Sequence, residues 1–592
     1  MAYSRRRGTA VNRYMRQSRR SLAAAVEAGE LAPVYGLPTQ SSLVPAEDLA
    51  DPRLPDLLHP TPSASIDRAA ARRALEFAFT AGDSAGVASG ALATAALAES
   101  EWEPESFADE IFLRELVDGV LRFQVGGKPA PLDRAHLQRL LTRPPRDRET
   151  LAFRQAILRE LRDDDVLRAA LTKVYEKLVA ILALFDESSG QSRYDLPRWR
   201  LDLLGALRAF FASLQGPFEH ARSGLSRLHT FGALVCQSEG FAELCGLLEF
   251  EGDMAQVDLH LCIGADGGVR RLDVMRVAEQ RTAPFYRGPV ARFFARLGAF
   301  LRGYRLGNLE LVERWFEHVY LGVLDFLPAV LQLRGDLEFY LTACHLEARA
   351  RAAGLSVCVP DVHETAPEGP RTLEGLFNPL LLLQHDAPVP CSLSVDSFHR
   401  TCILTGPNSG GKTRLLQALA LTQTLGQAGF FVPARRAELR RAPGMFVSLG
   451  QEGSADQEEG RLGTELLRIR RLFERARPGA LVILDELCSG TNPSEGEEIF
   501  HLVVGLLREL EPEVFITTHF LQFAQQLADR ADELSLCFLQ VELDEGRVPT
   551  YQFVPGVART SLARQTAARL GVSREELLAL IRRHHSGVRR GS

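Results

Sequence analysis

The sequence predicts an α + α/β fold, in which a long and mostly helical region precedes an α/β domain with a mainly parallel sheet. Two observations carry this prediction. Apolar residues recur at helical spacing over most of residues 66–353. From about residue 400, short apolar runs typical of buried strands alternate with helical patterns. This alternation predicts parallel strands that are joined by crossover helices.

Length and composition limit the function classes. A chain of 592 residues suggests roughly three or four domains. The chain is 46% hydrophobic and 24% charged, with a formal net charge of −6, so a nucleic-acid partner would have to be met by local basic patches. Nine cysteines without a C-x-x-C or metal-ligand spacing favour a reducing cytosol. We expect a cytoplasmic protein without a membrane partner, because no run of about 18 apolar residues exists.

Four segments are expected along the chain: a basic arm and Pro-rich linker (1–65), a helical N-terminal region (66–125), a helical core (126–375) and the α/β domain (376–592). The first 20 residues are rich in arginine and hold no acid. They form either a flexible arm for a polyanion or a solvated tail. The Pro-rich stretch up to about residue 65 is either a linker or an irregular wrap.

Residues 257–277 predict a β-hairpin inside the helical core. Apolar residues alternate from Val257 to Ile263, and Asp266-Gly267-Gly268 then turns the chain. The return strand carries three arginines. The hairpin is therefore either a small clamp that faces DNA or a structural element.

The most specific motif lies in residues 401–417. An apolar run, Cys402-Ile403-Leu404, predicts a buried strand, and a helical pattern begins after residue 413. Between them the chain reads G-x-x-x-x-G-K-[ST], which is the phosphate-binding loop in the strand–loop–helix context that it requires. Its glycines let the backbone approach phosphate oxygens, and the helix N-terminus presents free N–H groups. The loop consists of Gly406, Pro407, Asn408, Ser409, Gly410, Gly411, Lys412 and Thr413.

The chemistry of an ATPase completes this pattern. Lys412 suits the β- and γ-phosphates, and the Thr413 hydroxyl suits Mg²⁺. Residues 480–487 predict a buried strand that ends in Asp485-Glu486, at the sheet edge where α/β proteins place their sites. We expect Asp485 to hold Mg²⁺ through water and Glu486 to act as general base on the attacking water.

Two further segments are candidate parts of the site. A third buried strand, residues 514–520, leads to His519, which we expect to sense the γ-phosphate or to position water. Before the acidic strand, a turn with Gly463 and Thr464 opens a helix. Its N-terminus either reaches the ATP of a second subunit or is simply capped by Thr464.

Together these residues resemble the MutS family of DNA mismatch-recognition ATPases. GPNSGGKT is similar to the family's phosphate loop, and Thr518-His519-Phe520 is similar to its TH-[FY] strand end. Asp485-Glu486, Gly490-Thr491 and Gly496 fit its acidic motif, and residues 555–572 resemble its C-terminal Gly-x-x-x-x-Ser segment. Upstream, residues 143–161 and 378–395 more weakly resemble its helical core and the approach to its ATPase domain.

The resemblance implies a helical core and lever domain joined to an ABC-type P-loop NTPase domain, which dimerises around two composite ATP sites. It implies DNA as a partner, places the adenine near Val389 and Pro390, and assigns Gly463 and Thr464 to the contact with the partner subunit's ATP. Two departures stand out. The segment Gly463-Thr464-Glu465 lacks the family's serine and aromatic residue. The first 125 residues hold no counterpart of the mismatch-reading domain, and no small nuclease domain is expected after the ATPase domain.

The leading hypothesis is an ATP-dependent DNA-binding protein that acts in mismatch repair or recognises irregular DNA structures, as an ATP-switched dimeric clamp. One alternative is an ABC-type ATPase of another machine, in recombination control or on the ribosome. The other is a scaffold that binds ATP without hydrolysing it. Tight ATP binding with slow or absent turnover would favour the scaffold.

Overall fold

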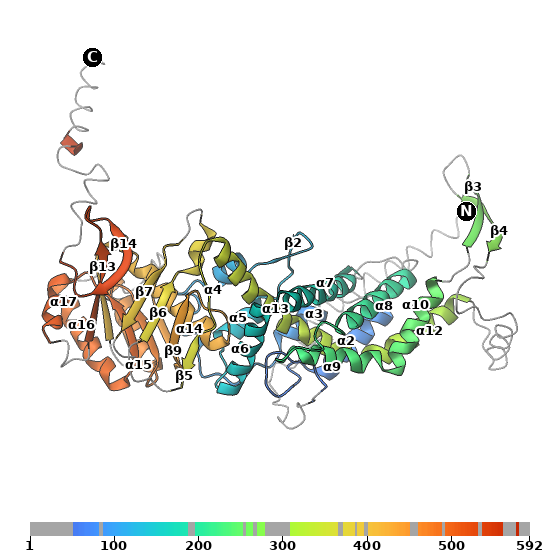
Figure 1. Ribbon diagram of the computed structural model, residues 1–592, viewed down its shortest axis with the longest axis horizontal. Coiled ribbons are helices and arrows are strands. Elements are labelled where there is room, and N and C mark those ends of the chain that lie inside the picture. Colours follow the sequence, from blue (N-terminus) through green and yellow to red (C-terminus); the bar gives the residue numbers. More distant parts are fainter. Residues whose placement is uncertain are drawn as a thin grey trace, which may run out of the picture.

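The computed structural model describes residues 51, 53–81, 87–187, 196–252, 256–263, 269–278, 308–364, 371–384, 388–395, 401–449, 460–487, 492–530, 536–559 and 576–578. The basic arm, the hairpin turn at 266–268, Gly490-Thr491 and residues 560–572 lie outside the described residues. Figure 1 shows a helical part on one side and an α/β part on the other, arranged along the longest axis of the molecule.

The helical part confirms the predicted periodicity. Its helices are α2 (Arg68–Ala81), α3 (Val87–Ala93), α4 (Leu113–Glu115), α5 (Arg134–Thr142), α6 (Arg148–Asp163), α7 (Asp165–Glu187), α8 (Leu196–Ser213), α9 (Ser226–Cys236), α10 (Glu239–Gly252), α12 (Asn308–Leu324) and α13 (Leu327–Ala352). Helix α6 begins after Asp147, whose carboxylate accepts a hydrogen bond from the Thr150 N–H at 2.6 Å. Helix α13 is buried over most of its length and packs against α2, α3, α5, α6 and α7, so it forms the centre of this part.

Two hairpins interrupt the helices within the described residues of this part. The predicted hairpin is confirmed: β3 (Gln256–Ile263) and β4 (Val269–Ala278) pair antiparallel, with Val257 opposite Val277. A smaller hairpin, β1 (Gln124–Val125) with β2 (Lys128–Pro129), stands before α5.

Residues 53–65 wrap over the helical part. Leu54, Leu57 and Leu58 are buried in its core. The Leu57 N–H donates to the Asp336 carboxylate of α13 at 2.9 Å, and the Tyr340 hydroxyl donates to the Leu57 carbonyl at 2.5 Å. These contacts make the described end of the Pro-rich segment an irregular wrap.

The α/β part holds a six-stranded sheet in the order β10-β11-β12-β8-β13-β14. The strands are β8 (Thr401–Thr405), β10 (Met445–Ser448), β11 (Leu481–Leu484), β12 (Glu513–Thr517), β13 (Leu536–Leu543) and β14 (Pro549–Pro555). The first five in this order run parallel, and β14 pairs antiparallel with β13. The three buried strands predicted around residues 402, 482 and 515 are thus confirmed, and they are neighbours.

A second sheet has the order β5-β9-β6-β7, with β5 (Asp361–His363), β9 (Arg436–Arg440), β6 (Arg371–Leu376) and β7 (Cys391–Val395). The expected domain boundary at residue 376 falls at the end of β6, a strand that pairs with both β7 and β9.

Side chains alternate between the two faces along each strand of the large sheet. Both faces carry apolar side chains, and each face packs against its own hydrophobic core. Cys402, Leu404 and Ile483 face a core that is continuous with the helical part and includes α14 (Lys412–Ala428). Ile403, Val482 and Val514 face a second core with α16 (Pro493–Leu507) and α17 (Leu521–Ala528). Within the described ranges, no single helix is long and apolar enough to span a membrane, although α12 from Phe316 and α13, bent by 58°, meet the length and composition test as a pair.

Candidate functional site

The loop between β8 and α14 has a backbone that only glycine suits at two positions. Gly406 has φ 140° and Gly411 has φ 83°, both in the region that residues with a Cβ avoid. A Cβ at Gly406 or Gly410 would lie 2.7 or 2.8 Å from Cγ2 of Val541, on the neighbouring strand β13. The loop is therefore pressed against the sheet, with its backbone curled around the start of α14.

The Lys412 side chain lies inside the loop and binds the backbone at the start of the loop. It is only 3% exposed, and its Nζ donates to the carbonyl oxygens of Gly406 at 2.9 Å and Pro407 at 3.0 Å. Burial lowers the pKa of the Lys412 ammonium, while the charges of Glu486 and Asp485 act in the opposite direction. The ammonium is thus held inside the loop, at the point where a bound phosphate would meet it.

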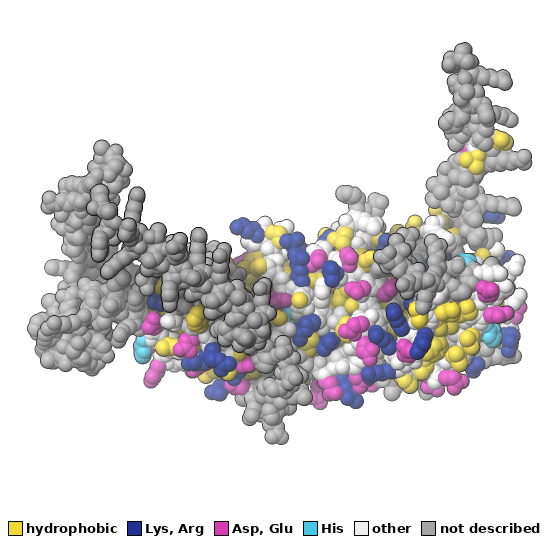
Figure 2. All heavy atoms as spheres, turned by 180° about the vertical axis from the view of Figure 1, so that it is seen from behind, with side chains coloured by type: hydrophobic (Ala, Val, Ile, Leu, Met, Phe, Trp, Pro, Cys, Tyr) yellow, Lys and Arg dark blue, Asp and Glu magenta, His cyan; other side chains and the backbone are white. Residues whose placement is uncertain are grey.

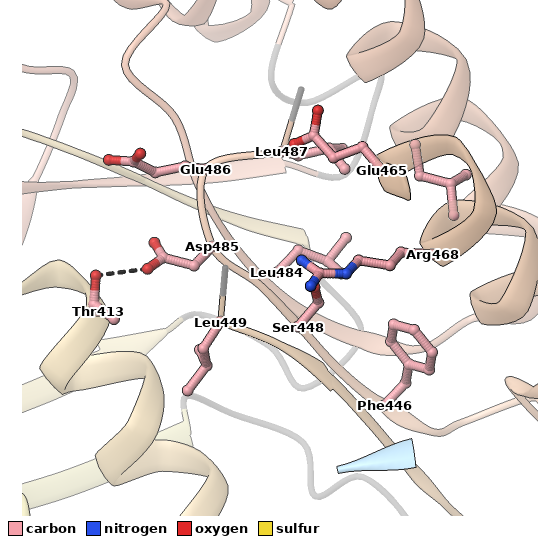
Figure 3. A pocket seen from close by; sticks show the side chains of 11 residues that line it. Thr413, Phe446, Ser448, Leu449, Glu465, Arg468, Leu484, Asp485, Glu486 and Leu487 are labelled. Atoms are coloured by element: carbon pink, nitrogen blue, oxygen red, sulfur yellow. Dashed lines mark hydrogen bonds between the residues drawn. The ribbon is translucent and has the colours of Figure 1, made fainter. Parts of the chain in front are cut away.

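Thr413 and Asp485 meet across the sheet edge. The Thr413 hydroxyl donates to Oδ2 of Asp485 at 2.5 Å, as the dashed line in Figure 3 marks. Asp485 directly follows β11, and its N–H donates to the Ser448 carbonyl at 2.8 Å, at the end of β10. The 72 residues between Thr413 and Asp485 in the sequence are bridged because β8 and β11 lie on either side of β12.

A carboxylate and a hydroxyl at this distance fit Mg²⁺. This ion takes one or two protein oxygens and completes its octahedron with water and substrate phosphates. Among the described residues no group of three or more His, Cys, Asp or Glu side chains could hold a metal by itself. The residues present therefore suit a metal that arrives with a nucleotide.

Glu486 has an unusual backbone. Its φ is 49°, which is uncommon for a residue with a side chain, and its N–H donates to the Thr517 hydroxyl at 2.7 Å. Figure 3 shows Glu486 beside Asp485 at the edge of the cavity. The cavity has a volume of about 360 Å³, and α14, the ends of β10 and β11, and the helix α15 (Gly460–Arg475) line it.

Helix α15 brings two residues to this cavity that were not predicted as site residues. Glu465 and Arg468 both line it, together with Asp485 and Glu486, and Figure 3 shows the Arg468 side chain reaching from α15 into the cavity. A spacing of three residues places Glu465 and Arg468 on one helix face. That spacing was a usable signal, but it could not indicate which face of α15 turns to the site.

The predicted positions in α15 need a correction. The helix begins at Gly460, so Thr464 lies in its second turn. The prediction that Thr464 caps this helix is therefore wrong, and Gly463 and Thr464 do not stand at its N-terminus. The pattern misled because the Gly-rich residues before Thr464 are themselves helical.

His519 lies two residues beyond β12. Its side chain is exposed, and its ring packs against Phe520 with a centroid distance of 4.3 Å. It is not one of the residues that line the cavity around Asp485. The structure places His519 at the same sheet edge as the acidic pair but outside the lining of this cavity.

Val389 and Pro390 lie just before β7, and Val389 is exposed. The Pro390 carbonyl accepts a hydrogen bond from the Gln552 side chain at 3.0 Å. The neighbouring Tyr551 is half-exposed with φ 61°, and its ring is 3.2 Å from where a Cβ of Gly411 would be. β14 therefore connects the predicted adenine position to the loop. Tyr551 was missed because an isolated tyrosine in a strand carries no sequence signal.

The parallel sheet, the glycine loop on its central strand and the acidic pair on a nearby strand form the arrangement typical of α/β domains that bind nucleoside triphosphates. Residues 402–584 match the family model of MutS domain V. This match covers most of the α/β part, and over these residues the chain is similar to the MutS family.

Relatives include proteins named endonuclease MutS2. The protein of Thermomicrobium roseum is 32% identical over 249 residues, 40% of this chain and 30% of the relative. That of Thermus thermophilus is 34% identical over 201 residues, 34% of this chain and 26% of the relative. That of Gemmatimonas aurantiaca is 30% identical over 292 residues, 48% of this chain and 35% of the relative. The matched regions span about a third of the length of these relatives.

Proposed function

We propose that this chain is an ATPase whose nucleotide cycle controls its binding to DNA of irregular structure, in mismatch repair or a related process. The observation that carries the ATPase part is the hydrogen bond between Thr413 and Asp485. It brings together the two residues that would hold Mg²⁺, one at the start of α14 and one directly after β11. In the chain, Lys412 directly precedes Thr413 and Glu486 directly follows Asp485.

Each residue has a role in the proposed reaction. Residues 406–413 surround the phosphates with backbone N–H groups, and Lys412 neutralises the β- and γ-phosphate charge. Thr413 and Asp485 would hold Mg²⁺, which would neutralise the negative charge that develops on the phosphates. Glu486 accepts the proton of the attacking water, and His519 orients that water or the γ-phosphate. Val389 and Pro390, with Tyr551 nearby, form the side on which the adenine rests.

The DNA-binding part of the proposal is supported by the similarity of residues 402–584 to MutS domain V, since members of that family bind DNA. Figure 2 shows positive and negative side chains interspersed over the described helical surface, so DNA contacts would come from local groups of basic residues. The hairpin β3–β4 is one candidate, because β4 carries Arg270, Arg271 and Arg276 in its sequence. We further propose that ATP closes a homodimer in which α15, with Gly463 and Thr464, faces the partner's nucleotide.

The test is ATP hydrolysis by the purified chain, measured alone and with a plain duplex, a mismatched duplex and a four-way junction at one fixed salt concentration. We expect either the mismatch or the junction to stimulate turnover more than the plain duplex does. Basal turnover without any response to DNA would contradict the DNA part. Tight ATP binding without turnover would contradict the ATPase part and support an ATP-binding scaffold.

Two variants separate binding from chemistry. Lys412→Ala should abolish ATP binding, because the only charge inside the loop is lost. Glu486→Gln should bind ATP normally, lose turnover and accumulate as a closed dimer that light scattering detects. Normal turnover in the Glu486→Gln variant would remove Glu486 from the role of general base.

A further inference from the structure

Thr517 connects the two acidic residues of the site. It is the last residue of β12, and its side chain is completely buried. β11 and β12 pair in parallel with Leu484 opposite Ile516, so the next residue on each strand brings Thr517 beside Asp485. The Thr517 hydroxyl can therefore contact the residues that follow β11. Because it is buried and does not line the cavity, it cannot contact a ligand there.

The Thr517 hydroxyl makes two hydrogen bonds. It donates to Oδ1 of Asp485, and it accepts the Glu486 N–H at 2.7 Å. The other carboxylate oxygen, Oδ2, receives the Thr413 hydroxyl. The Asp485 carboxylate is thus held from two sides, by one threonine at the exposed start of α14 and by another inside the sheet.

These two bonds differ in what a nucleotide would do to them. A metal ion bound with the phosphates would recruit the Thr413 hydroxyl as a ligand, and that hydroxyl could then no longer be held by Asp485 alone. Thr517 is buried and does not line the cavity, so its bond to Asp485 would persist. Thr517 also accepts the Glu486 N–H and so supports the left-handed backbone of Glu486, a conformation that is unfavourable for a residue with a side chain.

We propose that Thr517 is a positioning residue for the hydrolytic site. Its hydroxyl fixes the orientation of the Asp485 carboxylate toward the metal and, through the Glu486 N–H, fixes the backbone from which the Glu486 side chain reaches the attacking water. Thr517 touches neither substrate nor metal. This inference rests on the proposed ATPase function and adds to it a residue that no motif of the site includes.

The experiment compares Thr517→Val, Thr517→Ser and Thr422→Val in the full chain. Valine keeps the shape of threonine and removes the hydroxyl, whereas serine keeps the hydroxyl. Thr422 is an equally buried threonine on α14 whose hydroxyl has no hydrogen-bond partner within the described part of the chain, so Thr422→Val is the matched control. The readouts are kcat, the KM for ATP, the Mg²⁺ concentration for half-maximal rate, and ADP binding with and without Mg²⁺ by calorimetry.

We expect Thr517→Val to lower kcat and to raise the half-saturating Mg²⁺ concentration, each by about 10- to 100-fold, as found when a group that orients a metal ligand is removed. ADP binding without Mg²⁺ should be unchanged. Thr517→Ser should restore both values to within about threefold, and Thr422→Val should match the wild type.

Wild-type kcat and Mg²⁺ dependence in a folded Thr517→Val variant would overturn the inference while leaving the proposed ATPase intact. A wild-type chain that binds ADP·Mg²⁺ but never turns over ATP would overturn the proposed ATPase instead. In that case the Mg²⁺ dependence of ADP binding still decides the role of Thr517. If Thr517→Val fails to fold, Thr517→Ser is compared with Thr517→Ala, which also lacks the hydroxyl.

Discussion

Arg154 donates a hydrogen bond from Nη1 to the carbonyl oxygen of Ala428, 2.9 Å away, and thereby joins α6 of the helical part to the last residue of α14. Its Nε donates at the same time to the Leu58 carbonyl of the wrap. Arg154 is only 1% exposed, and its guanidinium lies 5.5 Å from the Phe339 ring centroid. The helix that starts at the candidate phosphate loop therefore ends on a buried arginine of the other part of the molecule.

Arg154→Met should destabilise the chain by about 3 kcal/mol, because two buried carbonyls lose a charged donor. The loss should appear as a lower midpoint of urea unfolding. Arg159→Met is the control, since Arg159 lies on the same helix but is exposed. Equal effects of the two substitutions would contradict a special role for the Arg154–Ala428 contact.

Gly410→Ala should cost about 1–3 kcal/mol, because its Cβ would overlap Val541. Adding Val541→Ala should return the stability to that of Val541→Ala alone, because the overlap is then gone. Gly406→Ala with Val541→Ala should stay below that level, since the φ of 140° at Gly406 remains unsuitable for alanine. Thermal unfolding of these four variants measures this, and a full rescue at Gly406 would argue against backbone strain there.

His519→Ala should lower ATP turnover by about 10-fold or more, the scale of losing a group that takes part in proton transfer or orientation. Since the side chain is exposed, unfolding free energy should change by less than about 0.5 kcal/mol. ATP binding should be preserved. His501→Ala, an exposed histidine on α16, serves as the control, and equal turnover in the two variants would exclude His519 from the reaction.

Asp336→Asn should become progressively less harmful, or stabilising, as the pH rises. Burial, and then the neighbouring Asp56 charge, raise the pKa of the Asp336 carboxyl well above 3.8. The folded state thus binds a proton that the unfolded state releases, so the wild type loses stability as the pH rises from about 4 toward the folded pKa. Asparagine cannot lose this proton, and its oxygen can still accept the Leu57 N–H. Urea unfolding at several pH values from 4 to 8 measures the free energy of unfolding of both proteins. The value for the variant should rise relative to that of the wild type as the pH increases.

Asp56→Asn should give the opposite trend. Burial acts to raise the pKa of Asp56, but hydrogen bonds from His59, Leu58 and Ser63, with the His59 charge, leave it lowered. The Asp56 carboxylate therefore contributes stability at neutral pH, and that contribution is lost as the pH falls through its folded pKa. If the stability of both variants relative to the wild type changed in the same direction with pH, the raised pKa of Asp336 and the lowered pKa of Asp56 would both be contradicted.

The sequence by itself determined the local elements and the residues that carry the proposed chemistry. Strand, loop and helix at 401–417 follow from an apolar run, two glycines with positive φ and a helical repeat, which act over a few residues. The strands before Asp485 and His519, and the hairpin β3–β4, follow from equally local patterns. These signals depend on backbone preference and burial, so they can be read without knowledge of the neighbours.

Only the tertiary structure decided which of these residues meet. The strand order β10-β11-β12-β8-β13-β14 brings Thr413 to Asp485 and places Val541 against the loop. It also places Thr517 beside the acidic pair and turns Arg468 into the cavity. The physical reason is that strand pairing and helix orientation depend on the packing of segments that are dozens of residues apart, and no periodicity within one segment records its neighbour.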